Sequence, residues 1–315
     1  MLLVVLHHSF LIVPPESIAH SLGAFNQTVV SMRMPILFFL AGCMIPGSMR
    51  KGMLHYTDSK LRHALWPYLG WQAQEIVMLG SIWGLLSLQN WGPISELWFL
   101  FFVLVYYIIA PLGKWIPWWL LSLIGLLTWA VIPAPDLVTQ LGFHATFFFA
   151  GAQTFGFVRN MKVTKSHLAI GAGLLIIPIA MSVGGVETYT WLMMVSSIFS
   201  IVALVILFTA MPENRFTHGL AWVGKRSVVY YVVHFPLFVY IGLLFGKLGL
   251  SPSLAWPLGL VITVALCTLI ASFRFKMPVS FFFEFPAKWV PWYGTLKKQQ
   301  AAFKTQRNKT KVTTA

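Results

Sequence analysis

The sequence predicts an all-α, polytopic membrane protein: a bundle of about ten transmembrane helices with a short first helix. Of its 315 residues, 58% are hydrophobic and only 10% are charged, and the mean hydropathy is +0.77. Soluble domains are typically about 45–50% apolar and about 25% charged. The apolar residues also gather in runs of the length that a helix needs to cross a bilayer, about 20 residues. These observations exclude an ordinary soluble domain.

Apolar windows, separated by charged and turn-forming residues, define the expected spans. Turns that combine Pro or Gly with interfacial Trp, such as Trp91-Gly92-Pro93, mark several boundaries. We expect one membrane domain over residues 1–293 and a basic, disordered cytoplasmic tail over residues 294–315. The ten spans are expected near residues 1–13, 28–45, 64–86, 97–112, 118–132, 141–158, 168–186, 189–211, 222–245 and 253–272.

The first segment is unusual because it is short and carries two histidines, His7 and His8. Only 13 residues precede Pro14, fewer than a full span requires. We expect either that translation begins inside an ancestral first helix or that the true start lies upstream. A cleaved signal peptide is the less favoured reading, because the segment has no basic residue before its apolar run.

The basic residues predict the orientation. With the N-terminus in the cytoplasm, the inside segments hold all but Arg33 and Lys247 of the 22 Lys and Arg residues, which fits an N-in, C-in topology with an even number of spans. The net charge of +14 therefore reflects topology and does not indicate a nucleic-acid partner. At the C-terminal tail it predicts attraction to anionic lipid head groups, at about 1 kcal/mol per basic residue near the surface.

Soluble-type catalytic and cofactor motifs are absent from the sequence. It contains no GxxxxGK[ST], HExxH, GxSxG or Rossmann fingerprint. Cys43 and Cys267 lie in different spans, and we interpret both as small apolar packing residues. We therefore expect no metal and no disulfide framework.

Ionisable side chains inside the spans are the candidates for chemistry, because charges in the bilayer are costly and tend to face a bundle interior. At 1.5 Å per residue, His8, Arg33, Glu75 and His234 all lie from the midplane outward. Each has a structural alternative: Arg33 could snorkel, Glu75 could bond a polar neighbour, and His234 could be a satisfied core histidine. The full set is His7, His8, Arg33, Glu75, His144 and His234.

The histidines of the spans leave alternatives open. His7 and His8 are about 100° apart on a helix, so at most one of them points squarely at a given target. His144 is expected at the interface, at the outer mouth of its span.

Phe38–Gly42 is echoed by Phe147–Gly151, for which chance in a Phe-rich chain is a sufficient explanation. Glycines at 42, 151 and 156 indicate close helix approaches.

One inside loop is a candidate site for a polyphosphate group. Arg50, Lys51, Lys60 and Arg62 lie together with two histidines within residues 50–63. Inside loops are basic for topological reasons alone, but Arg and Lys are also the usual partners of phosphate. The loop is therefore either a topogenic signal or a binding site.

Several stretches, in order, form a family pattern. An aliphatic run ends in a histidine, for which His8 is the better match, and Met34–Gly42 is similar to an FF-x-x-SG segment with Ala41 where Ser is usual. Together these stretches resemble acyltransferase family 3, the bacterial inner-membrane O-acyltransferases of cell-surface glycans, which have ten-helix cores. The family usually carries an arginine just upstream of the aliphatic run, on the cytoplasmic side, and this sequence begins after that position. Only a start upstream of Met1 would supply this arginine. The other matching stretches are Lys60-Leu61-Arg62…Trp66-Pro67-Tyr68, Leu97-Trp98-Phe99-Leu100, Gly224-Lys225-Arg226-Ser227…Tyr231…His234 and Glu284-Phe285-Pro286.

The resemblance implies transfer of an acyl group from cytoplasmic acyl-CoA, acetyl-CoA in the first instance, to a hydroxyl of a glycan or glycolipid on the outer side. In this interpretation His8 takes the proton from the hydroxyl, and Arg33 or His234 stabilises the oxyanion. Transfer through an acylated histidine is equally compatible with the sequence. The basic loop residues Arg50, Lys51, Lys60 and Arg62 would hold the CoA phosphates.

Two other classes of function remain open at this point. A transporter or flippase-like protein could use the same embedded His, Arg and Glu residues as a relay. A degenerate, inactive relative could act only as an assembly partner. Acyl transfer from labelled acyl-CoA in reconstituted vesicles separates the first class from these two.

Overall fold

The computed structural model describes residues 1–13, 23, 25–26, 28–93, 95–132, 136–183 and 187–298. Within these ranges the chain forms helices and no strands, which confirms the all-α prediction. Residues 299–315, most of the expected disordered tail, lie outside the described residues, and residues 294–298 at its start are helical.

The chain consists of two compact units. Unit 1 comprises residues 1–43 and 112–274, and unit 2 comprises residues 44–111 and 275–315. The helices of unit 1 are α1 (Leu2–His8), η1 (Ser9–Ile12), α3 (Val30–Cys43), α8 (Trp118–Val131), α9 (Leu137–Asn160), α10 (Lys165–Val183), α11 (Trp191–Ala210), α12 (Arg215–Lys225), α13 (Ser227–Lys247) and α14 (Pro252–Ser272). Unit 2 contains α4 (Ile45–Met49), α5 (Met53–Lys60), the π-helix η3 (Leu61–Leu65), α6 (Trp66–Leu79), η4 (Ile82–Leu86), η5 (Leu88–Trp91), η6 (Ser95–Leu97), α7 (Trp98–Ile109), η8 (Val279–Phe282) and η9 (Ala287–Trp289). The turn η7 (Ala110–Lys114) contains the boundary between them.

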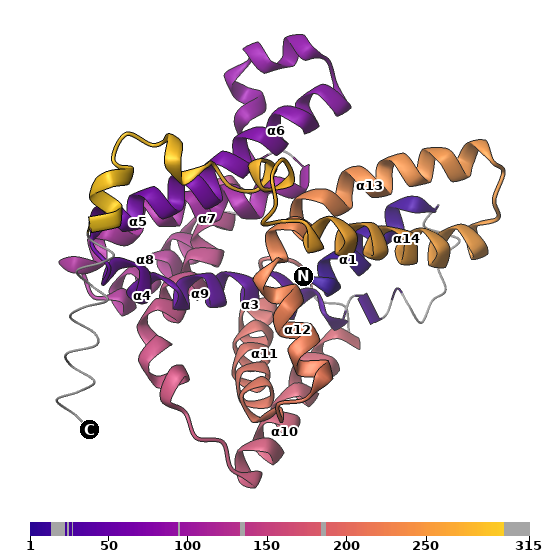
Figure 1. Ribbon diagram of the computed structural model, residues 1–315. Helices are drawn as coiled ribbons and strands as arrows, with labels where there is room; N and C mark the ends of the chain where they lie inside the picture. The colour runs from indigo at the N-terminus through magenta and orange to yellow at the C-terminus, as the bar shows by residue number, and fades with distance from the viewer. Residues whose placement is uncertain are drawn as a thin grey trace. The chain divides into compact units, whose positions relative to one another are not determined.

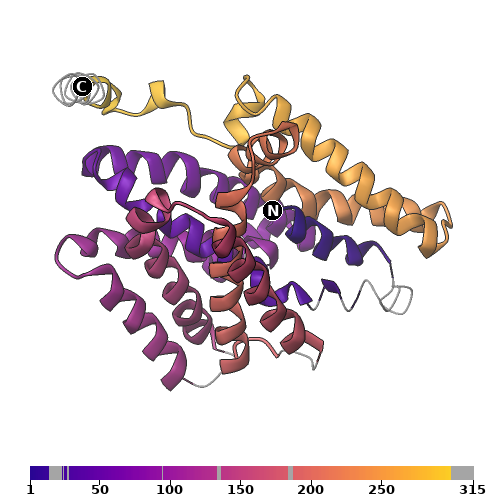
Figure 2. The same ribbon diagram turned by 90° about the horizontal axis from the view of Figure 1, so that it is seen from below.

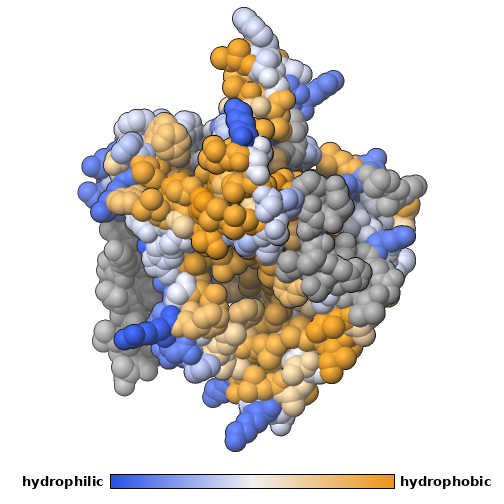
Figure 3. All heavy atoms as spheres, turned by 90° about the vertical axis from the view of Figure 1, so that its right-hand side faces the viewer, coloured by the Kyte–Doolittle hydropathy of each residue, from blue (hydrophilic) through white to orange (hydrophobic). Residues whose placement is uncertain are grey.

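Each expected span contains a helix. Four described segments are long and apolar enough to cross a membrane: Val30–Met49, Trp191–Ala210, Ser227–Lys247 and Pro252–Ser272. Four shorter apolar segments accompany them: Leu2–Ile12, Trp98–Lys114, Trp118–Val131 and Lys165–Met181. Apolar side chains cover wide areas of the face shown in Figure 3. The chain is therefore a membrane helix bundle.

The predicted first residue of the ninth span, 222–245, is wrong. Residues 222–225 end the separate helix α12, and α13 begins only at Ser227. Arg226, between the two helices, donates from Nε to the carbonyl oxygen of Ala271 at 3.1 Å, and its guanidinium lies 4.2 Å from the centroid of the Trp222 ring. These contacts fix the junction, and hydropathy alone does not show them.

The echoed Phe-Gly segments pack against each other. A Cβ atom at Gly42 of α3 would collide with the carbonyl oxygen of Phe148 in α9, and a Cβ at Gly151 of α9 would collide with the carbonyl oxygen of Phe39 in α3. The two motifs thus meet reciprocally, with the glycine of each lying against the backbone of the other. Gly42 and Gly151 mark close approaches as predicted, whereas the same prediction for Gly156 is wrong, because among the described residues no atom beyond its own helical turn lies within 4 Å of a Cβ built there.

The first helix of unit 1 packs on a helical hairpin. Helices α13 and α14 run side by side, and α1 and η1 contact both (Figure 1, Figure 2). Trp256 of α14 donates its indole N–H to Ser9 Oγ at 3.0 Å and stacks on Phe10. A Cβ at Gly259 would collide with Ile12, so α14 provides a recess for η1. The packing fixes the short first helix against α13, where His234 lies.

Within unit 2, the C-terminal segment 275–298 packs against η3 and α6. Trp66 and Trp71 donate their indole N–H groups to the carbonyl oxygens of Phe281 and Phe282, at 2.7 and 3.1 Å. The backbone N–H of Phe285 donates to the carbonyl oxygen of Arg62 at 3.1 Å. A π-helical turn such as η3 is rare and is often found at functional sites.

Candidate active site

Two of the predicted catalytic residues are in direct contact. Nδ1 of His8 lies 2.7 Å from Nε2 of His234, and the two rings stack with centroids 5.0 Å apart. His234 is fully buried in α13, one residue before Phe235 and two before Pro236, and His8 is partly buried at the end of α1. The two residues are 226 positions apart in the chain, and the packing of α1 on α13 brings them together.

The third predicted residue, Arg33, joins the other histidine through an amide. Arg33 is buried in α3, and its guanidinium donates from an Nη atom to Oδ1 of Asn26 at 2.7 Å. Nδ1 of His7 lies 3.1 Å from the same oxygen, and the rings of His7 and His8 are 4.9 Å apart. Unit 1 therefore holds His234, His8, His7, Asn26 and Arg33 in one continuous polar group.

Asn26 was missed in the sequence. It lies just before the expected second span, outside the window that hydropathy defines. The available signal was its spacing: residues 26 and 33 are seven apart, which places them on one face of a helix if the helical pattern continues upstream of the span.

The predicted position of His144 was wrong. It was expected at the interface, but it is 1% exposed and stacks on Phe38 with ring centroids 4.4 Å apart. Its ring also meets Phe143 and Tyr189 edge-on. It lies in an aromatic layer between α3 and α9, because α9 begins at Leu137, earlier than the expected start at residue 141.

In unit 2, Glu75 and Gln72 are both buried on one face of α6. Gln72 donates from Nε2 to the carbonyl oxygen of Asn90 at 2.8 Å, and Tyr68, one turn earlier, donates to that of Trp91 at 2.6 Å. These bonds tie α6 to the turn η5. The polar face of α6 thus has a structural role in holding this turn.

The basic loop residues of unit 2 divide into two pairs. Arg50 and Lys51 are exposed at the end of α4. Lys60 is partly buried, with its ammonium 4.0 Å from the centroid of the Tyr107 ring and 5.3 Å from that of Tyr56. Burial lowers the pKa of Lys60 to about 8. Its positive charge is therefore present at neutral pH and lost in mildly alkaline solution.

Arg62 belongs to an internal ion-pair network. It donates from Nε to the carbonyl oxygen of Phe285 at 2.7 Å and pairs with the carboxylates of Asp58 and Glu284. Nε2 of His63 lies 3.1 Å from the same Glu284 oxygen. Two carboxylates around one guanidinium leave little net positive charge for a phosphate at this position.

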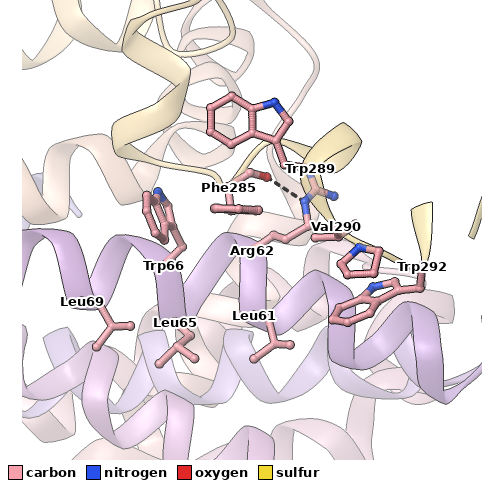
Figure 4. Close-up of a pocket in the computed structure, with 10 residues that line it drawn as sticks. Leu61, Arg62, Leu65, Trp66, Leu69, Phe285, Trp289, Val290 and Trp292 are labelled. Carbon is pink, nitrogen blue, oxygen red and sulfur yellow. Dashed lines mark hydrogen bonds between the residues drawn. The ribbon is translucent and has the colours of Figure 1, made fainter.

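An open apolar pocket of about 290 Å³ lies beside Arg62, within unit 2 (Figure 4). Leu61, Leu65 and Leu69 form one wall along a single helical face, and aromatic side chains form the other. Figure 4 shows Phe285, Trp289 and Trp292 around the guanidinium of Arg62. The indole N–H of Trp292 donates to Asp58 at 2.9 Å, so its polar atom is used in the network.

The comparison with protein families decides the class. Residues 1–272 match the family model of acyltransferase family 3, which is described as an acyltransferase domain. The chain belongs to this acyltransferase family. No curated protein and no solved structure matches it. The match confirms the resemblance predicted from the motifs.

The part of the acyltransferase chain that matches the family includes the whole polar group of unit 1 and the basic loop of unit 2. Glu284, which pairs with Arg62, lies beyond it. Across the described residues, no group of three or more His, Cys, Asp or Glu side chains could hold a metal ion. The polar group of unit 1 itself consists of three imidazoles, a guanidinium and an amide.

Proposed function

We propose that this acyltransferase moves an acyl group, in the first instance acetyl, from cytoplasmic acyl-CoA to a hydroxyl of a surface glycan or glycolipid. The observation that supports this proposal most strongly is the contact of His8 with His234. It gives one imidazole a partner for Nδ1, the arrangement that orients a histidine general base in hydrolases and acyl-transfer enzymes.

In this proposal, His8 accepts the hydroxyl proton at Nε2, because Nδ1 faces His234. The hydroxyl oxygen attacks the thioester carbonyl, and the C–S bond breaks when the tetrahedral intermediate collapses. The CoA thiolate leaves and takes up the proton from the His8 imidazolium. During this step the protonated His8 donates from Nδ1 to Nε2 of His234, a charge-assisted bond stronger than the neutral one.

The role of His234 is thereby refined. The sequence offered Arg33 and His234 as alternatives for stabilising the oxyanion. Because His234 bonds to the base, we assign it to orienting His8, and we assign the oxyanion to Arg33, a buried guanidinium in a water-poor environment where such contacts strengthen.

The donor phosphates are proposed to bind basic residues of unit 2. Arg50 and Lys51 are exposed, and Lys60 is charged at neutral pH. Arg62 remains a proposed donor contact, but its two carboxylate partners favour a structural role. The orientation proposed from the charge pattern, N-in and C-in with ten spans in a bacterial inner membrane, puts this loop on the cytoplasmic side, where acyl-CoA is found.

The test is acyl transfer in reconstituted vesicles. Purified protein is supplied with radiolabelled acetyl-CoA on the side of residues 50–62 and with glycan or glycolipid acceptors on the other. Protein-dependent label in the acceptor supports the proposal. Movement of the acceptor across the membrane without labelling would instead indicate a transporter. The absence of both labelling and movement would indicate an inactive relative.

A further inference from the structure

We propose that Asn26 is a positioning residue of the acyl-transfer site, a neutral bridge that holds the Arg33 guanidinium in place without neutralising its charge. This inference rests on the proposed function for its catalytic meaning. The hydrogen bonds that Asn26 makes do not depend on the proposed function.

The orientation of the Asn26 amide follows from its partner. Arg33 carries only donors, so the amide atom 2.7 Å from its Nη atom must be the oxygen. That oxygen accepts only, so Nδ1 of His7, 3.1 Å away, must also donate to it. The arrangement therefore fixes the tautomer of His7: the ring carries its proton on Nδ1, and Nε2 is the basic nitrogen.

An amide has an electrostatic consequence that a carboxylate would not have. Arg33 is 7% exposed, and a buried guanidinium is commonly paired with a carboxylate. A carboxylate here would satisfy the same two donors but would cancel the positive charge. Asn26 satisfies the donors and leaves that charge for an oxyanion that develops during the reaction.

The merely structural alternative is that Asn26 only ties its own segment to α3 and α1. The two readings differ for Asn26→Asp. This variant keeps both acceptor bonds and adds an ion pair to Arg33, so a structural role predicts unchanged turnover and equal or higher thermal stability. The positioning role predicts a turnover loss despite that stability.

The experiment measures kcat and KM for acyl transfer by Asn26→Asp in vesicles, beside its melting temperature. We expect kcat to fall by about 10²-fold, as for loss of an oxyanion contact, with KM for acyl-CoA little changed. Asn26→Gln, a neutral acceptor of different length, should keep more activity than Asn26→Asp. Wild-type kcat in a folded Asn26→Asp preparation would overturn the proposal, as would greater activity in Asn26→Asp than in Asn26→Gln.

A second measurement is independent of acyl transfer. In wild-type protein labelled with ¹⁵N-histidine, the NMR signal of His7, assigned by its loss in His7→Gln, should show a protonated Nδ1. A protonated Nε2 with bare Nδ1 would overturn the proposed bonding even if the enzyme is active. If the wild type transfers no acyl group but His7 shows the expected tautomer, the proposed function fails while the bonding of Asn26 stands.

Discussion

Two imidazole nitrogens 2.7 Å apart, as in His8 and His234, share one hydrogen, with one ring donating and the other accepting. If both rings were protonated, two donors and two positive charges would face each other. In the proposed reaction, Nδ1 of His8 is held by His234, so Nε2 of His8 takes the proton from the hydroxyl and returns it to the leaving group.

Lys60 gives a pH dependence with a defined sign. Its ammonium is charged below a pKa of about 8 and neutral above it, so a phosphate contact made by Lys60 is lost as pH rises. We expect the KM for acyl-CoA to rise between pH 7 and pH 9, by roughly tenfold at most, the ratio of the charged fractions. Steady-state kinetics across this range measure it.

Lys60→Arg is the matched control, because a guanidinium stays charged throughout this range. In that variant the rise between pH 7 and pH 9 should disappear. A wild-type KM that does not change with pH would remove Lys60 from the donor site.

At the residue scale, the sequence singled out candidate side chains but not the contacts between them. His8, Arg33 and His234 were identified because ionisable groups in apolar spans are costly. That His8 meets His234, 226 residues away, depends on which helix faces meet, and periodicity in a helix that is apolar all round does not show this. Asn26 was missed because an uncharged amide at the edge of a span gives no comparable signal.

At the scale of elements, the crossing of α3 and α9 depends on two glycines. Gly42→Ala and Gly151→Ala each place a methyl group against a backbone carbonyl of the other helix, which must move away. Such overpacking typically costs about 1–3 kcal/mol. We expect a lower melting temperature in detergent for both variants.

Gly156→Ala is the control on the same helix as Gly151. In the described part of the chain, a Cβ there meets nothing beyond its own helical turn within 4 Å, and alanine favours the helix by about 1 kcal/mol over glycine. This variant should be as stable as the wild type or more stable. Equal destabilisation by all three substitutions would contradict the crossing described for α3 and α9.

The C-terminal segment 275–298 depends on the Arg62 network for its attachment within unit 2. Glu284→Gln removes the carboxylate that pairs with Arg62 and His63, and hydrogen bonds to charged groups are worth about 1.5–3 kcal/mol. We expect amide hydrogen exchange in the C-terminal segment to quicken by roughly tenfold or more. Lys288→Ala, at an exposed position of the same segment, should leave the exchange unchanged. Equal protection from amide hydrogen exchange in Glu284→Gln and Lys288→Ala would show that the ion pairs do not hold the C-terminal segment.

The elements themselves were largely predictable, because hydropathy and positions of Pro and Gly determine where an apolar helix can run. The break at Arg226 was not, because it depends on a bond to Ala271 in the next helix. The similarity of the two Phe-Gly segments was visible in the sequence, but only the packing shows that they contact each other.

For the whole molecule, the distribution of basic residues predicts an N-in, C-in topology. All but two of the 22 Lys and Arg residues fall on one side in this arrangement. A reporter fused after Ala315 and one inserted in the loop at Asp136 should therefore report opposite compartments. The same compartment for both would rule out this topology.

The central claim is that this family member transfers acyl groups with His8 as its base, and the most direct test is the turnover of His8→Ala in vesicles with labelled acetyl-CoA. Loss of a general base typically costs about 10²–10⁴-fold, so we expect turnover to fall by that amount while the protein still inserts. His7→Ala should retain substantial activity, and His8→Ala combined with His234→Ala should be no worse than His8→Ala alone, because the two act as a unit. Wild-type turnover in correctly folded His8→Ala would contradict the claim.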